Sequence, residues 1–530
     1  MSIKIAPEKL REWILDDKEL ALIDVREEGQ FSTDGHLLFA VCLPLSHLEL
    51  KIFSLVPRKS VRVVLCDGDN GFSEIAAKRL LSWGYNDVSI LDGGAEGWLK
   101  AGNVLFRGVN VPSKAFGEFV EHDSGTPSIS PENLKSMIDS GDDILVLDSR
   151  PFSEFKRMNI PTAVNCPGVE LPYRIYDFIK RPETTVVVNC AGRTRSIIGA
   201  QSLINAGVKN NVVALQNGTM GWSLAGYDLE HGADRSISEK NDNERTNMQG
   251  IVKSLVERFG ISKTKIEEID SWNASDQSHS LFLLDVRTYE EYLSGHILGS
   301  VHAPGGQLVQ AIDRWVGVQG ARLVLIDDTG LRATMTASWL IQMGWKDVHV
   351  LANVDEVKGL KIGHPSKKFV PPKEKVQSIS LIDAKRAMKH GAVFLDFSTS
   401  LEYKAGHIEG SFWVVRSRLA EALSKFRHKG VIICTSPDGH LATYSASDLS
   451  AILNRTVLFL EGGTEAWIEA GFPISSGFEN LTTENNDIQY KAYDYDKDIE
   501  FHMKEYISWE VGLFDLVKKD GTAQFRHFSE

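Results

Sequence analysis

Residues 281–287 read LFLLDVR, an apolar run that closes on an aspartate, and this stretch decides the fold because the chain repeats it. The other copies read ALIDVR at 21–26, ILVLDSR at 144–150 and VFLDFS at 393–398. The copies are separated by the length of a small domain, well beyond the roughly 20–50 residues of a solenoid repeat. The sequence therefore predicts a tandem array of four domains.

Each copy continues in the same order, with a second β-branched run, a helix-like stretch and a third short strand. The second runs are VRVVL from Val61, TVVVN from Thr185, RLVLI from Arg322 and GVIIC from Gly430. Continuous Val, Ile and Leu without polar alternation indicates strands covered on both faces, and the stretches between them suit crossover helices. We therefore predict α/β domains, each built on a parallel sheet flanked by helices.

The domain boundaries follow from changes in composition. We predict domains at residues 1–110, 125–232, 247–360 and 376–476, with a carboxyl-terminal extension at 477–530. Polar stretches punctuated by Gly and Pro are expected to be linkers, and these are Gly108–Pro127, His231–Thr246 and His364–Lys375. The extension is rich in acidic and aromatic residues, and we expect it to pack back on a domain.

Composition excludes several classes of protein. The chain has 530 residues, and 58 Lys and Arg against 71 Asp and Glu give a formal net charge of −13. Hydrophobic residues make up 42% of the chain, so each domain can bury a core. An acidic chain offers no long basic face to neutralise phosphates, and small molecules or proteins are the expected partners rather than nucleic acid.

The expected location is the cytoplasm. Charges occur every few residues at the amino terminus, where an export signal would need an apolar core, and no run of about 18 apolar residues predicts a membrane span. The five cysteines are an odd number without a CxxC pair, so we expect reduced thiols rather than a disulfide framework or a metal site. Cys42 and Cys166 are expected to be core residues.

The loop after the second run of copy two carries the candidate chemistry, because ligands bind at the carboxyl ends of parallel strands. That run ends at Asn189, Cys190 follows, and Ser196 is expected to cap a helix that ends near Gly207. We expect Asp148 and Arg150 to form a polar clamp at the same edge of the sheet.

A short loop folded around Cys190 can direct several backbone N–H groups at the sulfur. These groups, the dipole of the following helix and two arginines would favour the thiolate, which is the nucleophilic form. Gly192 allows a tight turn, while Arg193 and Arg195 are expected to hold an anionic substrate.

The stretch Cys190-Ala191-Gly192-Arg193-Thr194-Arg195-Ser196 resembles the C-x-x-G-x-R-S loop of the rhodanese (thiosulfate sulfurtransferase) family. Gly-His-Ile at 295–297 and 406–408, and Gly-Gly-x-x-x-Trp in copies one and four, resemble the scaffold of that family over roughly residues 5 to 475. The resemblance implies four rhodanese-like domains, each with a five-stranded parallel sheet.

The resemblance also implies an activity. Cys190 would accept a sulfane sulfur from thiosulfate or a similar donor, carry it as a persulfide and pass it to a thiophilic acceptor such as cyanide, a thiol or a protein. The substrate-binding cradle would be Ala191, Gly192, Arg193, Thr194, Arg195 and Ser196. No metal and no organic cofactor is implied.

The other three copies depart from this motif. Copy one has Cys66 followed by aspartates, in a loop that reads as one residue longer if Ser73 matches Ser196. Copy three has Asp327 at the cysteine position, and a carboxylate cannot carry sulfane sulfur. Copy four has Cys434 without an arginine, in a loop that reads as two residues longer. We expect these three domains to be inactive.

Two other functions compete with sulfur transfer. Related loops hydrolyse phosphate esters, but they need Cys-x5-Arg, whereas Cys190 and Arg195 form Cys-x4-Arg and leave a cradle suited to a single sulfur atom. A non-enzymatic array that stores persulfide or binds proteins is favoured by the three degenerate loops and the acidic surface.

Overall fold

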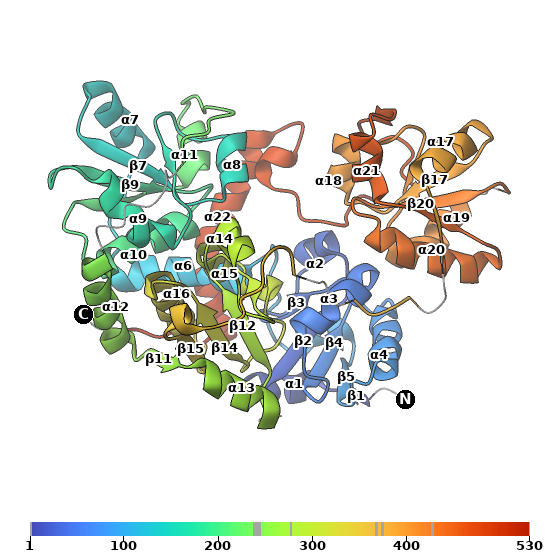
Figure 1. Ribbon diagram of the computed structural model, residues 1–530, viewed down its shortest axis with the longest axis horizontal. Helices are drawn as coiled ribbons and strands as arrows, with labels where there is room; N and C mark the ends of the chain where they lie inside the picture. The colour runs from blue at the N-terminus through green and yellow to red at the C-terminus, as the bar shows by residue number, and fades with distance from the viewer. Residues whose placement is uncertain are drawn as a thin grey trace.

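The computed structural model describes residues 3–236, 245–275, 278–365, 369–372, 376–425 and 429–528. The described chain forms four parallel five-stranded sheets, one for each copy of the repeat, and helices flank the sheets (Figure 1). The α/β fold class predicted from the repeated runs is confirmed. None of the described helices combines the length and the apolar character needed to cross a membrane.

All four sheets have the same strand order, in which the strand that ends on the repeated aspartate lies beside the second β-branched strand. The first sheet runs β1 (Ile3–Ile5), β5 (Val88–Leu91), β4 (Arg62–Cys66), β2 (Leu20–Asp24) and β3 (Val41–Cys42). The second runs β6 (Ser128–Ile129), β10 (Val212–Leu215), β9 (Thr185–Asn189), β7 (Ile144–Asp148) and β8 (Val164–Asn165). The third runs β11 (Ser262–Thr264), β15 (Val348–Leu351), β14 (Arg322–Ile326), β12 (Leu281–Asp285) and β13 (Val301–His302). The fourth runs β16 (Gln377–Ile379), β21 (Leu458–Leu460), β20 (Ile432–Thr435), β17 (Val393–Asp396) and β19 (Phe412–Trp413), and β18 (His407–Ile408) pairs with β22 (Ile474–Ser475) apart from it.

The helices of each unit connect these strands. The first unit has α1 (Pro7–Ile14), α2 (Glu28–Asp34), α3 (Leu48–Leu55), α4 (Phe72–Ser82) and α5 (Gly94–Lys100). The second has α7 (Pro131–Ser140), α8 (Phe152–Arg157), α9 (Glu170–Phe178), α10 (Thr194–Asn205) and α11 (Gly218–Leu224). The third has α12 (Arg245–Phe259), α13 (Ile266–Ser275), α14 (Tyr289–Ser294), α15 (Gly305–Gln310) and α16 (Leu331–Gln342). The fourth has α17 (Leu381–Lys389), α18 (Ser400–Ala405), α19 (Leu419–Lys425), α20 (His440–Leu453) and α21 (Gly463–Glu469).

The stretch Gly108–Pro127, expected to be a linker between the first two domains, forms a helix for most of its length. Helix α6 spans Val111–Ser124 and buries Phe116 and Val120 on one face. A proline near its start and Gly125 in the left-handed conformation after its end are the signals that bound such a helix. The other two expected linkers lie partly outside the described residues, at 237–244, 366–368 and 373–375.

The chain beyond the fourth sheet returns to the second unit. It passes through a short 3-10 turn at Ala492–Asp494 and ends in helix α22 (Ile499–Asp520), which runs along α6 (Figure 1). Tyr493 and Tyr506 of the extension contact the second unit, where Met220 packs with Met503 and Ala492. Two segments from outside the second sheet, α6 and α22, therefore lie next to it.

The buried side chains show how the units pack. One continuous apolar cluster runs through the first three units, including Val63, Val188 and Leu325 from their second β-branched strands. The fourth unit builds its core from separate clusters around Leu449 and Trp467. The first three units therefore form one packed body, and the fourth is joined to it through a more polar interface.

That polar interface centres on Glu27 of the first unit. Its carboxylate accepts hydrogen bonds from Ser46 Oγ at 3.1 Å and from Ser417 Oγ of the fourth unit at 2.6 Å. Beside it, Arg416 donates to Glu49 at 2.8 Å. Burial raises the pKa of Glu27 to about 7, against the weaker effect of the two hydroxyl groups.

We expect Glu27→Gln to flatten the pH dependence of stability. Between the usual pKa of a glutamate and about 7, folded Glu27 holds a proton that the unfolded chain has released, so the free energy of unfolding falls as the pH rises through this window. The full effect is about 3 kcal/mol. Urea unfolding at pH 5 and pH 8 measures it: the variant should gain stability relative to the native protein at pH 8. An equal change in the free energy of unfolding between pH 5 and pH 8 in both proteins would contradict the raised pKa of Glu27.

Candidate functional site: the Cys190 loop

The Cys190 loop joins strand β9 to helix α10. The helix begins at Thr194, two residues earlier than the expected start at Ser196, and Ser196 is not its cap. The Ser196 hydroxyl instead donates to the backbone oxygen of Arg193 at 2.7 Å and accepts from the Cys190 thiol at 3.5 Å. Ser196 therefore lies inside the first helical turn and contacts the sulfur.

The loop is held at the edge of the sheet by the polar clamp that the sequence predicted. Arg150 donates twice to the Asp148 carboxylate, at 2.8 and 2.6 Å, and both side chains are buried. Asn189 Nδ2 donates to Asp148 Oδ2 at 3.0 Å. Because Asn189 immediately precedes Cys190, the clamp fixes the start of the loop.

A close backbone approach fixes Cys190 from the other side. The backbone oxygen of Cys190 accepts a hydrogen bond from the Thr219 N–H at 2.8 Å, at the start of α11. Gly218 has φ +56°, and a Cβ atom there would lie 2.3 Å from the Cys190 oxygen. Only glycine fits such an approach in this conformation, so the turn after β10 sets the position of the cysteine backbone.

Strand pairing corrects the comparison of Cys190 with Cys66. In the second sheet the repeated aspartate Asp148 pairs with Asn189, and in the first sheet Asp24 pairs with Cys66. Cys66 therefore matches Asn189, and Asp67 occupies the position of Cys190. The extra residue expected in the first loop does not exist, because Asp67 and Ser73 have the same spacing as Cys190 and Ser196.

The same comparison of strand pairing also changes the alignment of Cys434 with the Cys190 loop. Asp396 pairs with Thr435, so Ser436 occupies the position of Cys190, and the two extra residues expected in the fourth loop are also absent. In the third sheet Asp285 pairs with Ile326, which leaves Asp327 at that position as predicted. Cys66 and Cys434 are fully buried, and burial raises the pKa of both thiols. Cys166 is buried as expected, whereas Cys42 is half buried.

The side chain at the first loop position collects backbone N–H groups in the three degenerate units. Asp67 accepts from the N–H groups of Asp69 and Ser73, both at 2.9 Å. Asp327 Oδ2 accepts from Arg332 N at 2.8 Å, and Ser436 Oγ accepts from Ala442 N at 3.1 Å. This loop geometry therefore accommodates an anion or another hydrogen-bond acceptor.

In the Cys190 loop, a carboxylate of the carboxyl-terminal helix α22 accepts hydrogen bonds at the start of α10. Glu510 Oε1 accepts from Thr194 Oγ1 at 2.5 Å and, more weakly, from Thr194 N at 3.4 Å. Glu510 Oε2 lies 3.0 Å from the position of a Cβ atom on Gly192. A negative group thus lies at the amino terminus of α10, where the helix dipole favours it.

Arg195 is bound by protein groups. It donates to Glu154 at 2.8 and 3.2 Å and to Gln307 of the third unit at 3.3 Å. Burial alone would raise the pKa of Glu154, but the Arg195 charge outweighs it and lowers that pKa to about 2. Arg195 therefore ties the loop to α8 and to the neighbouring unit.

Arg193 is also matched by carboxylates. It donates to Glu118 at 2.6 Å and forms an ion pair with Glu121, both on α6, and it contacts Asn217 at 3.3 Å. The two loop arginines were expected to hold the substrate, which stays a prediction, and the structure gives each of them carboxylate partners within the protein. The sequence could not show this, because the partners come from other units and from α6.

The third unit repeats the Arg195 arrangement. Arg332 lies at the position of Arg195 and binds Glu291 at 2.7 Å, as Arg195 binds Glu154. Across the interface Arg332 donates to Glu170 at 2.9 Å. The backbones meet between these contacts, where a Cβ on Gly168 would lie 2.4 Å from the Cα of Gly306. The second and third units thus pair through matching loops.

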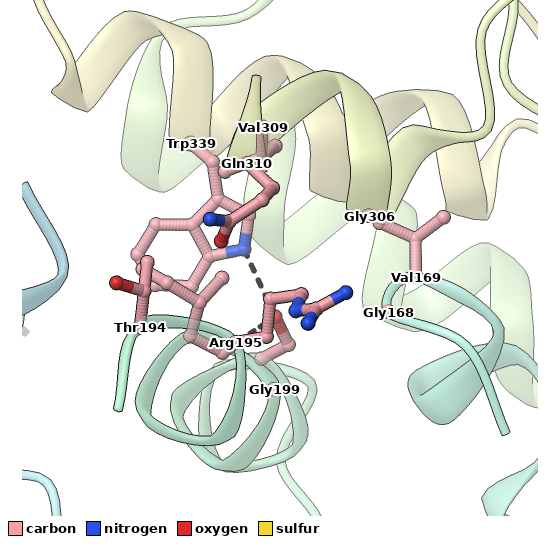
Figure 2. Close-up of a pocket in the computed structure, with 11 residues that line it drawn as sticks. Gly168, Val169, Thr194, Arg195, Gly199, Gly306, Val309, Gln310 and Trp339 are labelled. Carbon is pink, nitrogen blue, oxygen red and sulfur yellow. Dashed lines mark hydrogen bonds between the residues drawn. The ribbon is translucent and has the colours of Figure 1, made fainter. Parts of the chain in front are cut away.

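Figure 2 shows a cavity between α10 and the third unit, lined by Arg195 and Gly199 of α10 and by Gln310 and Trp339 of the third unit. The cavity there has a volume of about 20 Å³, enough for a single water molecule. Cys190 is not among the residues that line this cavity, so the cavity is distinct from the surroundings of the sulfur.

The structure adds a residue that the sequence analysis missed. Lys114 of α6 is buried, and its ammonium donates to the hydroxyl of Tyr506 on α22. Burial lowers the pKa of Lys114, and the negative charges of Glu510 and Cys190 only partly oppose this effect.

Among the described residues, no three His, Cys, Asp or Glu side chains converge as metal ligands.

Comparison with known proteins agrees with this architecture. The model of the family described as "Rhodanese-like domain" matches residues 6–101, 130–225, 267–353 and 380–470. The crystal structure of a thiosulfate sulfurtransferase from Pseudomonas aeruginosa is 40% identical, with a TM-score of 0.95 over 99% of this chain and 100% of that one. A putative sulfur carrier protein, YrkF of Bacillus subtilis (strain 168), is 25% identical over 136 residues, 24% of this chain and 72% of the relative.

Proposed function

The chain belongs to the rhodanese-like family, and from that premise we propose that Cys190 moves a sulfane sulfur from thiosulfate or a similar donor to a thiophilic acceptor. The likeness to a thiosulfate sulfurtransferase over the whole chain supports sulfurtransferase activity in general. The assignment of the donor, the acceptor and a persulfide on Cys190 is our proposal.

One observation carries the choice of Cys190. Four loops occupy the same place in four sheets, and their first positions hold Asp67, Cys190, Asp327 and Ser436. Only a thiolate can bind a sulfane sulfur and release it again. The second unit is therefore the one suited to turnover, and the other three serve as scaffold.

The reaction would proceed by two displacements at sulfur. The Cys190 thiolate attacks the outer sulfur of thiosulfate, the S–S bond of the donor breaks, and its electron pair leaves with sulfite. The acceptor then attacks the terminal sulfur of the Cys190 persulfide. That step breaks the new S–S bond and returns the electron pair to Cys190 as a thiolate, with thiocyanate as the product when cyanide is the acceptor.

The loop residues have distinct roles in this proposal. Ser196 contacts the sulfur through its hydroxyl group, and Ala191, Gly192 and Thr194 form the cradle at the start of α10. Backbone N–H groups and the helix dipole would stabilise the anionic sulfur of the thiolate and of the persulfide. Arg193 and Arg195 position the cradle through their carboxylate partners.

A persulfide-carrying or protein-binding array without turnover is the second candidate. It is favoured by the three loops that carry no sulfur at their first position. Turnover separates the two candidates, because a carrier would take up one sulfur for each Cys190 and release it only to a specific partner.

We expect intact-mass analysis after thiosulfate treatment to show the gain of one sulfur atom. Peptide mapping should place this sulfur on Cys190, and cyanide should remove it. Cys66 and Cys434 should stay unmodified because both lie buried within strands. Sulfur on any peptide that lacks Cys190 would overturn the assignment.

A further inference from the structure

The Cys190 site contains a buried charge pair that the proposed reaction does not use. Lys114 lies on α6 and Glu510 on α22, and the Lys114 ammonium is 4.0 Å from Glu510 Oε1. Neither helix belongs to the sheet that carries Cys190. Both side chains are buried, at 6% and 1% exposure.

Lys114 keeps hydrogen-bonding capacity in this environment. Within the described part of the chain, its ammonium donates one hydrogen bond, to the Tyr506 hydroxyl. The rings of Tyr506 and Trp509 lie 4.5 and 5.1 Å from the nitrogen, and the distance to Glu510 exceeds that of a hydrogen bond. An ammonium has three N–H groups, so this buried cation can still donate to an anion.

Glu510 also has unused hydrogen-bonding capacity. Its Oε1 is bound by Thr194, whereas Oε2 is buried and accepts no hydrogen bond from the described residues. Oε2 faces Gly192, two residues after Cys190. An unpaired buried carboxylate oxygen is costly in a folded protein, so its place beside the sulfur loop requires an explanation.

Lys114 lies within electrostatic range of the reacting sulfur. Burial lowers the pKa of Lys114 and raises that of Tyr506, and a negative charge on Cys190 acts upward on both, which places these groups within electrostatic range of the sulfur. The loop arginines, by contrast, are matched by Glu118, Glu121 and Glu154. Among the described cations near Cys190, Lys114 differs from the loop arginines in that its carboxylate partner, Glu510, lies 4.0 Å away, beyond hydrogen-bond distance.

We propose that Lys114 receives the anionic group of the sulfur donor beside Cys190, and that Glu510 opposes it, so that the pair sets which donor charge the site accepts. This inference rests on the proposed function and deepens it. Anionic donors such as thiosulfate depend on Lys114, whereas neutral reagents that reach the same sulfur do not. The opposing carboxylate limits the affinity for anions, so that the leaving anion can depart.

Alkylation of Cys190 tests the charge preference without requiring sulfur transfer. Iodoacetate and iodoacetamide react with the same thiol and differ by one negative charge. In the full-length folded protein, the ratio of their rates at Cys190, measured by peptide mass, should fall about tenfold in Lys114→Met and rise several-fold in Glu510→Gln. Lys114→Arg should stay near the native ratio. A purely structural role would change both rates together.

Lys100→Met is the matched control, because it removes an exposed ammonium that pairs with Glu96 on α5. Its ratio should equal that of the native protein. The variant Lys114→Met/Glu510→Gln leaves no unpaired buried charge, and it should recover stability lost in Lys114→Met while its ratio stays below that of Glu510→Gln. An unchanged ratio in Lys114→Met and in Glu510→Gln would overturn the inference.

Steady-state kinetics provides the second measurement. With thiosulfate as donor, Lys114→Met should raise KM about tenfold or more and change kcat less. Loss of kcat at constant KM would contradict a donor-binding role. A charge-dependent alkylation ratio without any sulfur transfer would refute the proposed function alone, and sulfur transfer with charge-independent alkylation and unchanged KM would refute this inference alone.

Discussion

Cys190→Ser will abolish sulfur transfer, lowering the rate of thiocyanate formation from thiosulfate and cyanide by at least about 1,000-fold. The substitution replaces the sulfur atom with the smaller oxygen atom and keeps the shape of the side chain, so the fold should be retained. A serine hydroxyl is not ionised near neutral pH and cannot hold a sulfane sulfur. The measurement is turnover at saturating thiosulfate.

Cys66→Ser and Cys434→Ser are the matched controls. Both thiols lie in strands, one and two residues before the position of Cys190, and neither belongs to the Cys190 loop. We expect each variant to keep most of the native turnover. An equal loss in Cys66→Ser, with the fold intact, would refute the single-site assignment.

Arg332→Met will destabilise the packed body of the second and third units by about 3–5 kcal/mol. Arg332 is fully buried and pairs with four carboxylates, Asp327, Asp328, Glu170 and Glu291. Methionine preserves much of the apolar stem but leaves these carboxylates without their cation. Thermal and urea unfolding at pH 7, followed by circular dichroism, measure the loss.

The loss should shrink at low pH. Arg332 outweighs the effect of burial and lowers the pKa of Glu291 to about 2, so its stabilising effect is present above the usual pKa of a glutamate and fades as the pH falls towards 2. Arg386→Met, which removes an exposed arginine paired with Asp383, should change stability by less than about 1 kcal/mol. A comparable loss in both variants would contradict the buried network.

The repeated strands were predictable from the sequence because their composition is a local property. Runs such as TVVVN are short, β-branched and apolar without polar alternation, which favours a strand of a sheet covered on both faces, and the structure places that run in strand β9. The polar clamp of Asp148 and Arg150 was predictable for a similar reason, since the two residues are separated by one position.

The register of the loops was not predictable from the cysteines. An alignment of the loops on their cysteines matches Cys66 and Cys434 with Cys190. Strand pairing with the repeated aspartate shows instead that Asp67 and Ser436 occupy the position of Cys190. Counting from Ser73 back to Asp67 would have given the six-residue spacing of the Cys190 loop.

The charged surroundings of Cys190 depend on contacts between distant segments. Helix α6 was recognisable in principle, because Ala115, Phe116, Phe119 and Val120 recur at helical spacing. No local pattern shows that Lys114 on this helix is buried, or that Glu510 reaches the amino terminus of α10. These positions follow from tertiary packing alone.

The contact between Thr194 and Glu510 joins residues that are 316 positions apart in the chain. A ribosome adds about 5–20 residues per second, so on the order of tens of seconds pass between the synthesis of the cysteine loop and that of the helix that covers it. During that interval the nascent chain carries its reactive sulfur exposed to the surrounding thiols and oxidants. Assembly of the finished site is therefore one of the last events in the biogenesis of this protein.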